Sequence, residues 1–189
     1  SEVTKNYRNM FWTESYNNAV RRYNDFKASN DKSLLDEAIT LFKESIEIDP
    51  LSNETYLILA NSYYEAGNNQ MAIESAQKAL DASPNDFQPN YRLGQILALT
   101  GEKKSAIKYI EKAINIDPAN SDAIRQLAML YYEDDQKEKS IETFKSAIEN
   151  EQDKNRKADL YYNLGVLNMQ LDNYNDADIA FEEAYYLNE

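Results

Sequence analysis

The sequence predicts an all-α fold, a solenoid built from antiparallel helix pairs. Three prolines stand 34 residues apart, and three alanines keep the same interval, each 12 residues before a proline. The prolines are Pro50, Pro84 and Pro118, and the alanines are Ala38, Ala72 and Ala106. Gly and Pro number only four each in 189 residues, so helix breakers are scarce. A fixed period of this size is typical of one supersecondary unit that repeats along the chain.

Residues 53–84 show the repeating unit most clearly. Apolar side chains first recur at helical spacing, and Gly67 then predicts the end of that helix and a turn. A second helical run of small residues follows until Pro84 closes the unit. The first run is Tyr56, Leu59, Ala60 and Tyr63, and the second run is Ala72, Ala76 and Ala79. The unit is therefore predicted to be a helix, a short turn and an antiparallel helix.

The first unit, at about 16–52, is irregular. Its second helix is marked by Ala38, and its first helix is expected around Tyr23, but about six extra residues near 29–33 lengthen either the helix or the turn. Residues 7–12 form a further apolar segment, which is either the start of the same helix or an N-terminal cap. Residues 1–15 are therefore set apart as an N-terminal segment or cap.

The remaining units are predicted at about 53–86, 87–120, 121–157 and 158–189. The unit at 121–157 lacks the closing proline and runs into a charged stretch at 149–157. Gly165 lies 37 residues after Ala128, so about three residues are inserted before the last unit.

The unit resembles the tetratricopeptide repeat family. Its signature is an aromatic residue, Leu-Gly and a tyrosine in the first helix, then Ala, Phe and Ala in the second helix and a closing proline. Residues 53–84 match with two departures, Ala60 and Ala76, and the likeness extends over nearly the whole chain from about Tyr16. The resemblance implies a right-handed superhelical solenoid of about five units that serves as a protein-interaction scaffold.

Small residues provide an independent reason for the paired helices. Each first helix carries one small residue opposite another in the second helix, so the two backbones can approach closely. The first set is Ala60, Gly94, Ala128 and Gly165, and the second set is Ala72, Ala106, Ser140 and Ala177.

Composition excludes several classes of function. The net charge of −13 disfavours nucleic acids and anionic membranes, and it favours solubility or a basic partner. Cysteine and histidine are absent, which removes thiolate chemistry and the commonest general base and metal ligand. No apolar run approaches the ~18–20 residues that span a membrane. No cofactor, metal or nucleic-acid partner is expected.

Acidic pairs do not change this expectation. Neighbouring carboxylates such as Glu182 and Glu183 point about 100° apart on a helix and do not converge on one site. Asp134 and Asp135 stand where earlier units have glycine, which predicts a turn. Residues 172–178 lack the glycine of a calcium loop and are expected to form an interhelical turn. The chain is predicted not to be an enzyme.

A groove lined by the first helices is the predicted binding site, because stacked pairs present them on the concave side. Tyr, Arg and Met suit protein interfaces. The predicted groove residues are Leu57, Asn61, Tyr64, Tyr91, Arg92, Gln95, Arg125, Met129, Tyr132, Tyr162, Val166 and Met169. Arg92 and Arg125 could pair with one acidic group of a ligand. The alternative is that some of these tyrosines pack between units.

One branch of the family clamps a partner's C-terminal carboxylate with Lys, Asn and Arg side chains. Only Asn61 of this chain matches that pattern, so the resemblance does not imply this kind of recognition.

The predicted function is a non-catalytic scaffold that binds an extended or helical peptide in the groove. One alternative is a self-assembling module that forms homo-oligomers, either through the C-terminal end, where no capping unit follows Ala184, or through the apolar segment at 7–12. Another is a truncated adaptor domain of a longer protein. The cytoplasm is favoured as the location, and the periplasm stays open because the chain opens on Ser1 and a targeting segment removed before it would leave no trace.

Overall fold

The computed structural model describes residues 2–188, with side chains from Tyr7 onward, and this part holds ten α-helices and no strand. The helices are α1 (Glu2–Ser29), α2 (Lys32–Ile48), α3 (Asn53–Glu65), α4 (Asn69–Ala82), α5 (Phe87–Leu99), α6 (Lys103–Ile116), α7 (Ser121–Glu133), α8 (Lys137–Asn150), α9 (Lys154–Gln170) and α10 (Tyr174–Asn188). The predicted all-α class is confirmed.

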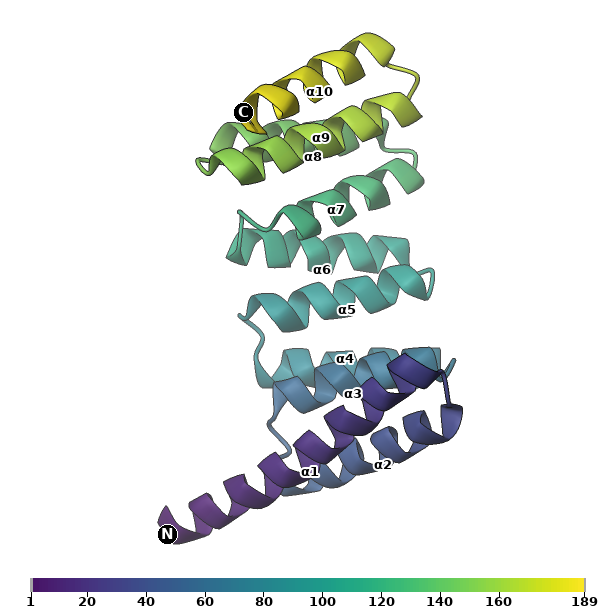
Figure 1. Cartoon of the computed structure of the whole chain (residues 1–189), viewed down its shortest axis with the longest axis vertical. Helices are drawn as coiled ribbons and strands as arrows, with labels where there is room; N and C mark the ends of the chain where they lie inside the picture. Colours follow the sequence, from purple (N-terminus) through teal and green to yellow (C-terminus); the bar gives the residue numbers. More distant parts are fainter. Residues whose placement is uncertain (1, 189) are drawn as a thin grey trace. The chain divides into compact units, whose positions relative to one another are not determined.

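The helices fall into two compact units, α1–α5 up to Gly101 and α6–α10 from Glu102 onward. Within each unit, consecutive helices pack side by side and run in opposite directions (Figure 1). The first helices of successive pairs also touch, so α1, α3 and α5 form one row in the first unit, and α7 lies beside α9 in the second. This is the packing that repeated antiparallel pairs require.

Helix ends follow the signals in the sequence. The three periodic prolines each stand two residues after a helix, at the ends of α2, α4 and α6. Proline cannot continue a helix, because it lacks the backbone N–H and restricts the residue before it. Side-chain oxygens cap the starts of five helices by accepting a backbone N–H bond. These caps are Asp31, Ser52, Asn68, Asn120 and Asp153.

The turns within the pairs use a left-handed residue. Gly67 and Gly101 have φ of 77° and 92°, and Asp135 has φ of 58° at the position one period later. The predicted turn at Asp135 is therefore confirmed. The turn expected at 172–178 is shorter than predicted. Helix α10 already begins at Tyr174, so only residues 172 and 173 of this range lie in the turn, and Asp172 has the left-handed conformation.

The first insertion lengthens both helices of its pair. Helix α1 runs six residues past Tyr23, whereas α3 runs two residues past Tyr63. Helix α2 begins six residues before Ala38, whereas α4 begins three residues before Ala72. The turn between α1 and α2 shrinks to two residues, compared with three between α3 and α4. Helix α1 is also continuous through residues 7–16, so the segment at 7–12 is the start of the same helix.

The second insertion lengthens α9. This helix begins 11 residues before Gly165, whereas α7 begins seven residues before Ala128. The linker before α9 has three residues, 151–153, compared with four before α7. The linker holds Gln152 where a further 34-residue step from Pro118 would place a proline.

An ion pair between a buried carboxylate and a half-exposed arginine lies at this linker, which has no proline. The Glu151 side chain is only 5% exposed, and its Oε2 lies 2.9 Å from Nε of Arg156. Glu151 Oε1 accepts bonds from Nη2 of Arg156 at 3.1 Å and from the backbone N–H of Asp153 at 2.8 Å. These donors, Arg156 first, hold the pKa of Glu151 below its usual range. The charged stretch predicted here therefore contains a buried, fully bonded carboxylate.

We expect Glu151→Gln to lower the free energy of unfolding by roughly 1–3 kcal/mol at neutral pH, because it weakens the charge-assisted bonds to Arg156. The folded-state pKa of Glu151 lies below the unfolded value, so the ion pair stabilises the fold above the unfolded pKa. That stabilisation is lost as pH falls through the folded pKa. Urea unfolding of both proteins at neutral and at acidic pH measures the difference.

The matched control for this prediction is Glu149→Gln, because Glu149 is exposed and forms no ion pair within residues 7–188. A difference between wild type and Glu151→Gln that is equally large at acidic pH would contradict the ion-pair explanation.

The core confirms the predicted faces. In the first unit, the predicted positions of α3 and α4 are buried. In the second unit, Oγ of Ser140 donates a 2.5 Å bond to the Ala128 carbonyl, which shows how closely the small residues bring the two helices together. The same close approach occurs at Gly165, where a Cβ atom would lie 2.6 Å from the Phe181 ring.

Candidate functional site

The predicted groove residues are divided between the two units. Six belong to α3 and α5 in the first unit, and six belong to α7 and α9 in the second. The first group is Leu57, Asn61, Tyr64, Tyr91, Arg92 and Gln95, and the second group is Arg125, Met129, Tyr132, Tyr162, Val166 and Met169.

Side chains of α1, α3 and α5 meet on one surface of the first unit. Nζ of Lys27 in α1 lies 2.6 Å from Oε1 of Glu65 in α3. Burial is the main cause that raises the pKa of Tyr23; Lys27 and Arg92 lower it and Glu65 raises it. The charges of three helices therefore act on one phenol group. We call this surface, around Tyr23, Lys27, Glu65 and Arg92, the first-unit face.

The predicted groove residues of α3 and α5 extend this face. Asn61 lies three residues before Tyr64 and four before Glu65, so it neighbours both on the surface of α3. Gln95 lies three residues after Arg92 and neighbours it on the surface of α5. Nη1 of Arg92 donates a 2.9 Å bond to Oε1 of Gln95. Arg92 forms no ion pair with any residue in the described part of the chain. The guanidinium group of Arg92 therefore bonds to a neutral amide, and a carboxylate of a ligand could take the place of that amide.

The second group is more exposed and partly occupied. Tyr162 and Met169 are 58% and 47% exposed, and the Tyr162 ring lies 5.6 Å from that of Phe181. Arg125 is already paired with Asp122 at 3.0 Å. Tyr132 packs against the core of the second unit, as the alternative interpretation of the tyrosines expected. The shared anion site of Arg92 and Arg125 stays a prediction, since these residues belong to different units.

Another tyrosine of α7 shows how burial changes its chemistry. Tyr131 is buried and donates a hydrogen bond to the Glu111 carboxylate of α6. Burial, and next the bond to Glu111, raise the pKa of Tyr131 to about 12. The phenol group stays neutral and joins the two helices.

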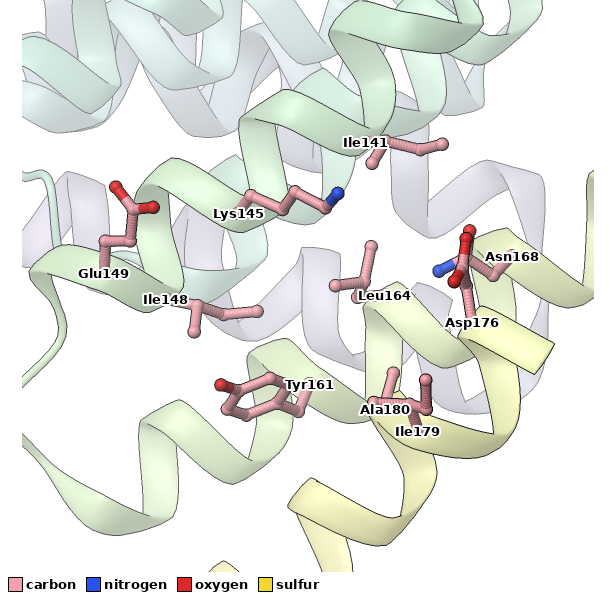
Figure 2. A pocket seen from close by; sticks show the side chains of 10 residues that line it. All are labelled: Ile141, Lys145, Ile148, Glu149, Tyr161, Leu164, Asn168, Asp176, Ile179 and Ala180. Atoms are coloured by element: carbon pink, nitrogen blue, oxygen red, sulfur yellow. The ribbon is translucent and has the colours of Figure 1, made fainter. Parts of the chain in front are cut away.

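A hollow of about 370 Å3 in the second unit was not predicted from the sequence (Figure 2). Its floor and walls are apolar and come from α8, α9 and α10, and three charged side chains stand at its edge. We call it the α8–α10 hollow; its lining residues are Ile141, Lys145, Ile148, Glu149, Tyr161, Leu164, Asn168, Asp176, Ile179 and Ala180. The available signal was a second apolar stripe on α8 and α10, beside the one assigned to the core.

The described part of the chain offers neither a metal site nor a membrane-spanning helix. Among residues 2–188, no group of three or more acidic side chains could hold a metal ion. No described helix combines the length and the low polarity that crossing a membrane requires.

The tetratricopeptide repeat family matches the chain over residues 57–121, 122–153 and 158–189, which together make up more than half of its length. These ranges contain all or most of each helix from α3 to α10, whereas α1 and α2 lie outside them. The chain belongs to the tetratricopeptide repeat family. The resemblance stated from the sequence is thus confirmed.

Relatives agree with this assignment. The protein CTR9 homolog of Arabidopsis thaliana is 29% identical over 102 residues, which are 52% of this chain but only 9% of the relative. The crystal structure of MamA has a TM-score of 0.66 at 25% identity and covers 83% of this chain and 90% of MamA. YrrB, described as a tetratricopeptide repeat protein with an unusual peptide-binding site, has a TM-score of 0.61 at 22% identity, with 95% and 91% covered. The family supports a protein-interaction scaffold.

Proposed function

We propose that the first-unit face binds an extended peptide segment of a partner protein. The observation that carries this proposal is the contact of α3 with both α1 and α5, where the ion pair of Lys27 and Glu65 lies near Tyr23. A surface shared by three successive first helices offers an extended chain several contacts in a row. A structural relative, YrrB, is described as having a peptide-binding site. No catalytic role is proposed.

The side chains of the face define the peptide that fits it. Arg92 would exchange its amide partner for a carboxylate of the peptide, which is the stronger bond. Asn61 can both donate to and accept from a peptide backbone, and Tyr64 offers a half-buried ring to an apolar side chain. The net charge of −13 favours basic residues elsewhere in the same peptide.

The test uses a peptide selected from a random phage-displayed library against the whole chain, with binding measured by fluorescence anisotropy. We expect the double variant Tyr64→Ala, Arg92→Ala to weaken binding at least tenfold, because it removes an aromatic contact and the charge that anchors the carboxylate. Circular dichroism confirms that the fold is kept.

The matched control is Tyr162→Ala, Arg125→Ala, which removes the same two residue types from the second unit. Its affinity is expected to equal that of wild type. Loss of binding in this control, together with full affinity in the first variant, would place the peptide on the second unit and contradict the proposal.

A further inference from the structure

We propose that the chain also associates with itself head to tail, with the N-terminal half of α1 of one copy docked in the α8–α10 hollow of another. This goes beyond peptide binding, since neither surface belongs to the first-unit face. The inference rests on three observations: an exposed apolar ridge on α1, an apolar hollow between α8, α9 and α10, and opposite charges on these two surfaces.

The ridge consists of Tyr7, Met10 and Phe11, which we call the α1 ridge. Their exposed fractions are 59%, 54% and 54%, and their spacing of three and four residues places them on one side of α1. This spacing is typical of a helix that docks in a groove of a partner. Large apolar side chains grouped in this way mark an interaction surface more often than an ordinary solvated one.

The position of the ridge is fixed by the residues that follow it. The Trp12 ring stacks on Tyr16 at 5.1 Å, and its indole N–H donates a 3.3 Å bond to Oγ1 of Thr55 in α3. The inner side of α1 is thus attached to the first unit from Trp12 onward. The ridge is held in helical form before it meets a partner, which lowers the entropic cost of docking.

The hollow suits a few large side chains rather than a folded domain. Its volume of about 370 Å3 lies toward the small end of the ~300–1,000 Å3 of ligand pockets. Ile148, Leu164 and Ala180 form a buried apolar floor, and Ile179 stands at the edge with 59% of its surface exposed. Side chains of the α1 ridge would cover this apolar surface.

The charges of the two helices are complementary. Helix α10 carries four acidic residues and no basic one, whereas Arg8 is the one charged residue in the segment of α1 at 7–12, which bears the ridge. Figure 2 shows Glu149 and Asp176 toward opposite ends of the hollow, with Lys145 between them. Neither carboxylate forms an ion pair within residues 7–188. Arg8, exposed beside Tyr7, supplies a cation for this edge.

This geometry makes the contact heterologous, because the ridge and the hollow are different surfaces. Each copy keeps a free ridge or a free hollow after the first contact, so association continues to a ring or an open chain. The average mass in solution should therefore rise with concentration beyond that of a dimer.

The test pairs two variants, each with one surface disabled. Met10→Glu, Phe11→Glu disables the ridge, and Ile179→Arg disables the hollow at an exposed position. By analytical ultracentrifugation, we expect wild type to associate and each variant to lose association at least tenfold. An equimolar mixture of the two variants is expected to form a complex that stops at two chains, because it contains one intact ridge and one intact hollow.

Control variants show whether a loss of association comes from this contact. Tyr185→Arg changes an exposed residue of α10 outside the hollow and should associate like wild type. Should Ile179→Arg disturb the circular dichroism spectrum, Glu149→Lys, Asp176→Lys replaces it. Tyr64→Ala, Arg92→Ala should also associate normally, which separates this contact from peptide binding. A wild-type chain that stays monomeric at all concentrations, or a mixture that forms no complex, would overturn the proposal.

Discussion

Replacing Phe144 with alanine is expected to lower the free energy of unfolding by roughly 3–5 kcal/mol. Phe144 is 1% exposed and lies at the centre of the second unit. Its ring packs among side chains of three other helices, namely Ile124, Ala128, Leu160, Leu164, Leu167 and Ala180. The substitution removes the apolar contacts of the ring and leaves a cavity that helices on several sides cannot close.

Urea unfolding followed by circular dichroism measures this loss. Tyr186→Ala is the matched control, since it removes an aromatic ring of similar size that is exposed on α10. The control should change stability by less than about 0.5 kcal/mol. A similar loss in both variants would show that Phe144 does not hold the core together as described.

Gly165→Leu is expected to destabilise the chain by roughly 1–3 kcal/mol through overpacking. The first added carbon would already lie 2.6–2.9 Å from three atoms of the Phe181 ring, and leucine adds further carbons beyond it. Replacing glycine inside a helix also stabilises the folded state by about 0.5–1 kcal/mol, because glycine loses more backbone entropy on folding. This gain offsets only part of the cost of overpacking. A lower melting temperature, by a few degrees, is the direct observation.

The double variant Gly165→Leu, Phe181→Ala tests the cause of this loss. Removing the Phe181 ring vacates the space that leucine needs, so the double variant should be more stable than the sum of the two single effects predicts. Strict additivity would mean that the contact between Gly165 and Phe181 is not the source of the destabilisation.

Most of the fold could be predicted because the repeat determines it locally. The periodic prolines end α2, α4 and α6, and the residue one period after Gly101 forms the expected turn. The effect of the first insertion could not be predicted, since its residues suit a helix as well as a turn. Asn30 decides the outcome by ending α1 in a left-handed conformation with φ of 57°, which asparagine tolerates.

The binding surfaces were predicted less completely. The helical register placed Asn61, Tyr64 and Arg92 on the first helices, but Tyr23 and Lys27 of the irregular first unit were not included in the predicted groove. The α8–α10 hollow is formed by three helices together, so the second apolar stripe on α8 and α10 could not indicate it without their arrangement in space. The Glu151 pair was missed because charged stretches are usually solvated, and its burial arises from the joint before α9.

The two insertions show how a repeat unit can lengthen without losing its packing. Relative to their counterparts, α1 and α9 are four residues longer and α2 is three residues longer, which is close to one helical turn of 3.6 residues in every case. A whole turn returns the next side chain to the same side of the helix, so Ala38 and Gly165 are buried like their counterparts in the other units. A unit lengthened by one turn therefore keeps its contacts with the neighbouring helices and gains new surface at the lengthened ends.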